Sequence, residues 1–82
     1  MKIKLLFFAS CRDATGTREA EIEVEEGITV SSLKDLLIIT YPNIRSQLKT
    51  ISVAVNSEYM NDETTLNNGD EIALIPPVSG GN

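Results

Sequence analysis

The sequence predicts an α+β domain in which one main helix packs on one face of a mixed sheet of four or five strands. Three observations lead to this prediction. The chain has 82 residues, of which 41% are hydrophobic, enough for one core but not for two. Segments rich in apolar and β-branched residues occur near both ends and once between them. Only residues 29–41 have apolar side chains at helical spacing over several turns.

Two strands are expected first. Residues 3–8 are apolar except for Lys4, and the side chains at odd positions are assigned to the core face. The stretch "CRDATGTREA" is polar around Gly16 and is expected to be a loop. "AEIEVEE" alternates Ile22 and Val24 with glutamates, the pattern of a half-buried strand. Two consecutive strands joined by one loop predict an antiparallel hairpin.

The main helix is expected after Gly27. Thr29 has the side chain of an N-cap, and Pro42 ends the helix at or just before Tyr41 because a proline cannot continue it. "NIRSQLKT" is short and mixed, and one turn of helix is expected there.

The remaining strands lie in the C-terminal half. "ISVAVN" predicts a third strand, residues 58–60 a brief edge strand, and "DEIALIP" the last strand, which Pro76 and Pro77 end. A right-handed crossover places the first and last strands side by side in parallel. This order of elements satisfies the β-grasp architecture, with a domain over residues 1–75 and an extended tail over residues 76–82.

Composition limits the partners and the compartment. A net charge of -5 argues against binding to nucleic acid or to an anionic membrane and favours a positively charged protein partner. The apolar run at the N-terminus is too short to span a membrane, and a single cysteine fits a reducing compartment, so a cytoplasmic protein is expected. The glutamates along the second strand are expected to discourage edge-to-edge aggregation. These glutamates are Glu19, Glu21, Glu23, Glu25 and Glu26.

Self-contained catalysis is not expected. Without histidine the chain cannot build a Ser–His–Asp triad, a Cys–His pair or a histidine-ligated zinc site by itself. The acidic pairs at residues 62–63 and 70–71 lack the spacing of a calcium loop and are interpreted as a solvated or partner-facing rim, so neither a metal nor a bound cofactor is expected. Cys11 is interpreted as a spectator in a loop rather than a sulfur-handling thiol.

One face of the predicted sheet is expected to be exposed to solvent and yet carries apolar side chains. The face opposite the helix would carry a single apolar patch made of Leu6, Phe8, Ala54, Ala73 and Ile75. Isolated exposed apolar side chains are common, but residues that cluster on neighbouring strands favour a partner interface, with Phe8 as its anchor. Arg12 has two open interpretations, a contact with the partner or a local turn with an ion pair.

The closing segment "PPVSGGN" has little side chain to pack. Pro76 and Pro77 favour a stiff, extended segment, while Gly80 and Gly81 supply a thin backbone that can pass down a narrow channel. The chemistry available at such an end is that of a carboxylate. A carboxylate is a poor electrophile and needs activation, for example as an acyl-adenylate, before a sulfur or nitrogen nucleophile can attack it.

"KLLFFASCRDATG" and "LNNGDEIALIPPVSGG", with "TVSSLKDLL" and "AVN" between them, resemble the small subunits of molybdopterin synthase, which are ubiquitin-like sulfur carriers. The similarity runs from Lys2 to Gly81. It implies a β-grasp fold and a carrier subunit of a heterotetrameric synthase whose large subunit supplies most catalytic groups.

The resemblance also implies a mechanism and a set of site residues. An E1-like adenylyltransferase would use ATP to adenylate Gly81, a sulfur donor would give the thiocarboxylate, and the large subunit would pass the sulfur to cyclic pyranopterin monophosphate. Gly80 would give access to the reacting carbon. The residues expected to contact the partner are Leu6, Phe8, Arg12, Ala73, Ile75, Pro76, Pro77, Val78 and Ser79.

Asn82 departs from the family pattern, in which the second glycine is terminal. With Asn82 attached, Gly81 has no free carboxylate, so removal or an artefact is favoured over lost function. Two other functional classes stay open. One is a related carrier for thiamine, cysteine or tRNA thiolation, although the proline pair favours molybdopterin synthesis. The other is a ubiquitin-like modifier or binding module that does no sulfur chemistry.

Overall fold

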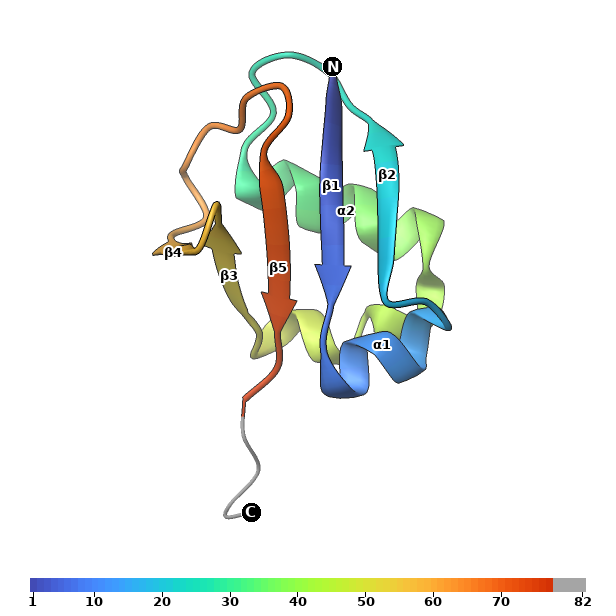
Figure 1. Ribbon diagram of the computed structural model, residues 1–82. Coiled ribbons are helices and arrows are strands. Elements are labelled where there is room, and N and C mark those ends of the chain that lie inside the picture. Colours follow the sequence, from blue (N-terminus) through green and yellow to red (C-terminus); the bar gives the residue numbers. More distant parts are fainter. Residues whose placement is uncertain (78–82) are drawn as a thin grey trace.

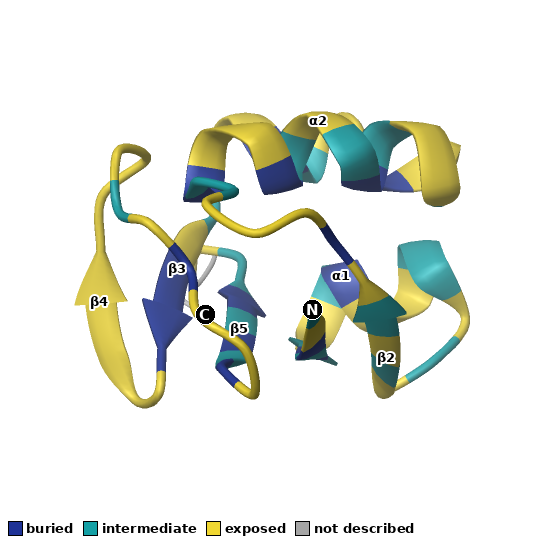
Figure 2. Cartoon of the chain, turned by 90° about the horizontal axis from the view of Figure 1, so that it is seen from above, coloured by how far each residue is buried: buried dark blue, intermediate teal, exposed yellow. Residues whose placement is uncertain are grey.

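A computed structural model describes residues 1–77, so the predictions for residues 78–82 lie outside the described residues. The chain forms a five-stranded sheet in the order β2-β1-β5-β3-β4, and α2 crosses one face of it (Figures 1 and 2). No helix within residues 1–77 is long and apolar enough to cross a membrane. The elements, in chain order, are β1 (Lys2–Phe7), α1 (Ala9–Thr15), β2 (Glu19–Glu23), α2 (Val30–Thr40), η1 (Pro42–Ile44), η2 (Gln47–Lys49), β3 (Ser52–Val55), β4 (Glu58–Met60) and β5 (Glu71–Ile75).

Strand β1 lies between β2 and β5 and pairs antiparallel with β2 and parallel with β5, as the sequence predicts. The parallel register aligns Leu5 with Ile72 and Leu6 with Ala73. On the other side, β3 pairs antiparallel with both β5 and β4. The sheet is therefore mixed, and β1 and β5 are its one parallel pair within the described residues.

The core lies between this sheet and α2. The odd-numbered side chains of β1 are buried, as predicted, and so are Ile72 and Leu74 of β5. From α2, the core receives Val30, Leu33 and Leu37, which recur at helical spacing.

Both ends of α2 agree with the sequence. The Thr29 hydroxyl oxygen accepts a hydrogen bond from the Ser32 backbone N–H at 3.2 Å, which confirms Thr29 as the N-cap. The helix ends before Tyr41, whose backbone leaves the helical region, and Pro42 begins η1. The Tyr41 ring packs edge-on against Phe7, with ring centroids 5.4 Å apart.

The connection between β1 and β2 is a helix, so the predicted loop there is wrong. Residues 9–15 form α1, with Cys11 as its one buried residue. A helix whose buried face is a single small side chain shows no apolar periodicity, and the polar composition therefore hides it. Gly16 ends it as a left-handed cap with φ 76°, and its N–H donates to the Arg12 carbonyl at 2.8 Å.

Asp70 does not lie on a solvated acidic rim, since its side chain is only 8% exposed. Its two carboxylate oxygens accept hydrogen bonds from Asn56 Nδ2 at 2.9 Å and from the Asn67 backbone N–H at 2.7 Å. Asn56 Oδ1 accepts in turn from the Glu71 N–H at 2.9 Å. Asn56 and Ser57 form the two-residue hairpin turn between β3 and β4, both with positive φ. The network thus ties this turn to the start of β5.

We predict that Asp70→Ala lowers the free energy of unfolding by about 1–3 kcal/mol, because Asn56 and Asn67 each lose a partly buried hydrogen-bond partner. Urea denaturation measures the change. Glu63→Ala removes an exposed carboxylate that makes no ion pair within residues 1–77, and it is the matched control. Equal stability of the two variants would contradict the structural role of Asp70.

Candidate functional site: the open sheet face and the root of the tail

An apolar row crosses the sheet face that α2 leaves open. The strand registers align Leu6 of β1 with Ala73 of β5, Ala73 with Ala54 of β3, and Ala54 with Tyr59 of β4. Side chains at aligned positions of neighbouring strands point to the same face of a sheet. Leu6 and Ala73 are partly exposed, and Tyr59 is 71% exposed. We call these four residues the apolar row.

Phe8 extends the apolar row on a fixed backbone. Its extended dihedral angles continue the alternation of β1, so its side chain lies on the same face as Leu6, and it is 46% exposed. The Phe8 N–H donates to the Leu74 carbonyl at 3.4 Å, and its carbonyl accepts from the Cys11 N–H at 2.9 Å. Ala9 then turns the chain into α1 with φ 46°. An exposed aromatic side chain on a backbone held in this way is suited to anchor a partner, because little flexibility is lost on binding.

The root of the tail, residues 75–77, leaves the sheet at the same end of the strands as Phe8. Because β1 and β5 are parallel, both strands end at the lower edge in Figure 1, and the chain continues beyond β5 from there. Ile75 and Pro76 are partly buried, while Pro77 is exposed. Neither proline has an N–H, so the ladder of β5 cannot continue through them.

Two predictions for this face need revision. Ala54, expected to be exposed, is only 5% exposed, because its single methyl group lies between the neighbouring strands β5 and β4. Tyr59 was missed, since three residues are too few to show which side of a strand faces water. The register set by the turn at Asn56 and Ser57 is what places Tyr59 opposite Ala54.

Arg12 lies exposed on α1, the helix that Phe8 caps. The local ion pair considered for it is absent from the described part of the chain, where no salt bridge joins Arg12 to Asp13. Its position next to the anchor leaves the partner contact as a prediction. The tail positions predicted from sequence, Val78, Ser79, Gly80 and Gly81, lie beyond the described residues.

Cys11 is completely buried against the core at the end of β1. Burial in apolar surroundings raises the pKa of the Cys11 thiol, because the charged thiolate loses its hydration. Since the thiolate is the nucleophilic form, the structure favours the spectator interpretation of Cys11, although within a helix rather than a loop.

The chain resembles known proteins over almost its whole length. The profile of the ThiS family matches residues 5–81. The molybdopterin synthase sulfur carrier subunit of Chlamydomonas reinhardtii is 40% identical over 99% of this chain and 100% of its own length. That of Mycobacterium tuberculosis is 38% identical over 99% of each. The chain belongs to the family of the molybdopterin synthase sulfur carrier subunits.

Solved structures agree with this family assignment. SAMP1 from Haloferax volcanii superposes with a TM-score of 0.89 at 29% identity, covering 99% of this chain and 100% of that protein, which confirms the β-grasp fold. Subunit 1 in the complex of subunits 1 and 2 of the molybdopterin-converting factor from Helicobacter pylori matches with a TM-score of 0.72 at 26% identity, covering 99% of this chain and 100% of that chain. A relative of this sulfur carrier family is therefore known in complex with a second subunit.

We predict that Cys11 reacts at least about tenfold more slowly with a disulfide reagent such as DTNB in the folded protein than in urea, because both burial and the raised pKa suppress the thiolate. Release of the coloured thiol product at pH 8 measures both rates. Ser10→Cys in the Cys11→Ala background, on a less buried position of the same helix, is the control that should react quickly when folded. Fast reaction of Cys11 in the native state would reopen its candidacy as a sulfur-handling group.

Proposed function

We propose that this chain carries sulfur as a thiocarboxylate on Gly81 and delivers it to cyclic pyranopterin monophosphate inside a complex with a large synthase subunit. The observation that supports it best is that Phe8 and the root of the tail lie at the same end of the sheet, and that Phe8 extends the apolar row on the open face. A partner that covers this face meets the departing tail as part of the same surface. Membership of the sulfur carrier family supports the same assignment.

The chemistry requires the carboxylate of Gly81 to be activated. In the first proposed reaction step, an E1-like adenylyltransferase joins that carboxylate to the AMP portion of ATP and releases pyrophosphate. Sulfur supplied at the oxidation level of sulfide then attacks the carbonyl carbon, displaces AMP and leaves the thiocarboxylate. The chain has no histidine, and its one thiol is buried, so the folded domain offers neither of these common catalytic groups. The activating enzyme and the large subunit supply the catalysis in this proposal, and this chain supplies the carrier.

The reach of the tail fits delivery into a cavity of a partner. The six residues 76–81 would span roughly 20 Å if a partner held them fully extended, at 3.3–3.6 Å per residue. In the proposal, Pro76 and Pro77 direct this segment away from the sheet, Val78 and Ser79 line the entrance, and Gly80 leaves room around the reacting carbon of Gly81. The free thiol of Cys11 is compatible with the reducing conditions of the cytoplasm, where we place the reaction.

Asn82 has to be removed before this chemistry can begin. An amide bond from Gly81 to Asn82 leaves no carboxylate for adenylation at Gly81. The ThiS profile matches as far as Gly81 and does not include Asn82. The proposal therefore includes a proteolytic step that frees Gly81.

A ubiquitin-like modifier is the second candidate, which the close superposition with a small archaeal modifier protein favours. In that role, the activated Gly81 would be attacked by the amine of a lysine on a target protein. The two functions differ in product. A carrier yields a free chain with sulfur at its end, whereas a modifier yields an amide-linked conjugate of higher mass. A carrier of a related thiolation pathway would give the first product but would not supply molybdopterin synthesis.

We predict that Phe8→Asp weakens binding to the large synthase subunit by roughly tenfold to a hundredfold, because it places a charge where an aromatic anchor is buried on association. The fold should survive, since Phe8 is half exposed. Isothermal titration calorimetry measures the affinity. Ile39→Asp, at a side chain 77% exposed on the outer surface of α2, adds the same charge away from the site and is the control. Equal affinity of Phe8→Asp and the unaltered chain would remove this face from the proposal.

We predict that a chain ending at Gly81 gains about 16 Da when it is incubated with the adenylyltransferase, ATP and a sulfur donor, the mass of sulfur in place of oxygen. A chain ending at Gly80 should bind the large subunit with unchanged affinity but fail to form molybdopterin, because its end falls one residue short. Intact-mass spectrometry and product fluorescence are the readouts. Sulfur transfer at the normal rate by the shorter chain would show that Gly81 is not the carrier position.

A further inference from the structure

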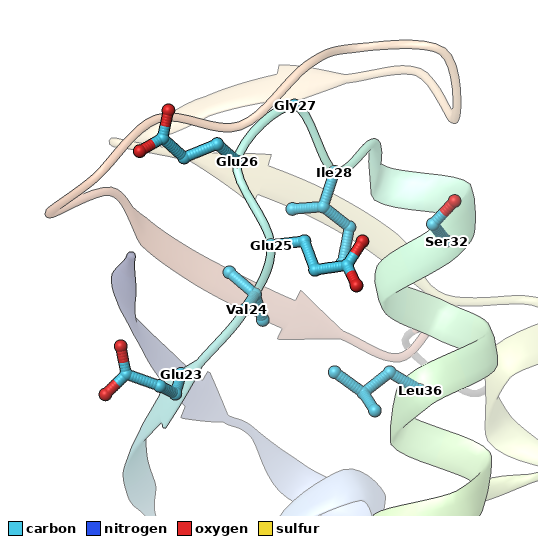
Figure 3. Close-up of a pocket in the computed structure, with 8 residues that line it drawn as sticks. All are labelled: Glu23, Val24, Glu25, Glu26, Gly27, Ile28, Ser32 and Leu36. Atoms are coloured by element: carbon cyan, nitrogen blue, oxygen red, sulfur yellow. The ribbon is translucent and has the colours of Figure 1, made fainter.

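A groove with an apolar floor lies between the end of β2 and the first turns of α2, away from the tail (Figure 3). Val24, Ile28 and Leu36 form the floor, and the two latter side chains are only partly buried. Glutamates occupy the strand side of the groove, and Ser32 closes it on the helix side. The nearby β2 is one of the two outer strands of the sheet, so one of its edges has no neighbouring strand.

The ladder between β1 and β2 determines which backbone groups reach that edge. Met1 and Val24 exchange two hydrogen bonds of 2.8 Å, one in each direction. In an antiparallel ladder such pairs alternate with pairs that make no hydrogen bonds to each other. Lys2↔Glu23 and Lys4↔Glu21 are therefore of the second kind. The N–H and carbonyl groups of Glu21 and Glu23 point away from β1 and have no backbone partner within residues 1–77.

The same edge and the segment that follows it carry five of the twelve acidic residues of the chain. Glu19 and Glu23 each lie near one positive group, Lys4 Nζ at 3.6 Å and the N-terminal amine at 3.8 Å. No salt bridge within the described chain neutralises Glu21, Glu25 or Glu26. A second copy of this chain would bring its own glutamates to the edge, and like charges that face each other oppose association. The edge is therefore closed to self-association and open to a cationic strand.

We propose that the β2 edge and its groove bind an extended segment of a partner protein in which basic and apolar residues alternate. The segment adds a sixth strand beside β2, hydrogen-bonded to the backbone of Glu21 and Glu23. Its apolar side chains point to the helix side and enter the groove over Ile28 and Leu36. Its lysine or arginine side chains point to the opposite face, where the glutamates of β2 lie.

This second surface does not compete with the tail. Because β2 runs antiparallel to β1 and β5, its C-terminal end and the groove lie at the opposite end of the strands from the root of the tail (Figure 1). A protein that holds the chain by the β2 edge leaves the tail free to enter another protein. The inference goes beyond sulfur transfer, and it holds or fails independently of the chemistry at Gly81.

The first experiment titrates the full chain with a capped heptapeptide that alternates lysine with valine, and with a control peptide of the same composition with its lysines grouped at one end. We expect the alternating peptide to bind at least about tenfold more tightly, with amide NMR shifts concentrated in residues 19–28 and 32–36. Equal affinity of the two peptides would indicate unspecific charge attraction and would overturn the proposal. Shifts confined to the apolar row would do so as well.

The second experiment separates the groove from net charge. The double variant E21K/E23K should bind the alternating peptide roughly tenfold or more weakly, whereas E58K/E63K, with the same change in charge near the far edge, should bind within about twofold of the unaltered chain. Leu36→Ser should weaken binding, and Ile39→Ser on the outer face of the same helix should not. Equal losses in a variant and its control would refute the assignment, and NMR dispersion verifies that each variant is folded.

Discussion

The parallel pairing of β1 and β5 is the constraint on which the rest of this structure depends. Four of their side chains, Ile3, Leu5, Ile72 and Leu74, are essentially inaccessible to water and form the centre of the core. Parallel neighbours cannot be joined by a tight turn, so the chain must cross over the sheet between them, and α2 is the covering element of that crossover. The same pairing brings the ends of two strands to one edge. It thereby puts an aromatic anchor from the start of the chain beside a tail from its end.

The two faces of the sheet have different roles, one in stability and the other in exposing an apolar surface. The face under α2 is closed, and it supplies the burial that a chain of this size needs for stability. The other face keeps an apolar row exposed, which is a risk of aggregation for any isolated domain. Acidic side chains on β2 protect one outer strand, and β4 limits the other because it has only three residues. Phe8 and Tyr59 are exposed on this open face, where a partner can cover them, whereas Ile39 is exposed on the outer surface of α2.

Sequence patterns correctly predicted the elements in which buried residues recur at a regular spacing. The alternation in β1 and β5 and the helical spacing in α2 gave correct elements and correct inward faces. The pattern did not reveal α1, because Cys11 is the one buried residue of that helix. Asp70 was misread for another reason, since its hydrogen-bond partner Asn56 is 14 positions away and only the fold brings them together. The open face was predicted in outline, but Tyr59 joined it through a strand register that three residues cannot specify.

A carrier of this kind must be recognised several times while it carries out no chemistry within its own core. Its folded domain holds its one thiol buried with a raised pKa and contains no histidine, and the proposed function assigns the chemistry to the main-chain end. Recognition then has to be separated from reactivity in space. The apolar row adjoins the tail and suits a partner that consumes the reactive end. An acidic edge on the opposite side suits a partner that holds the carrier while that end is at work elsewhere. Because β1 and β5 run one way and β2 runs the other, a single small sheet provides both.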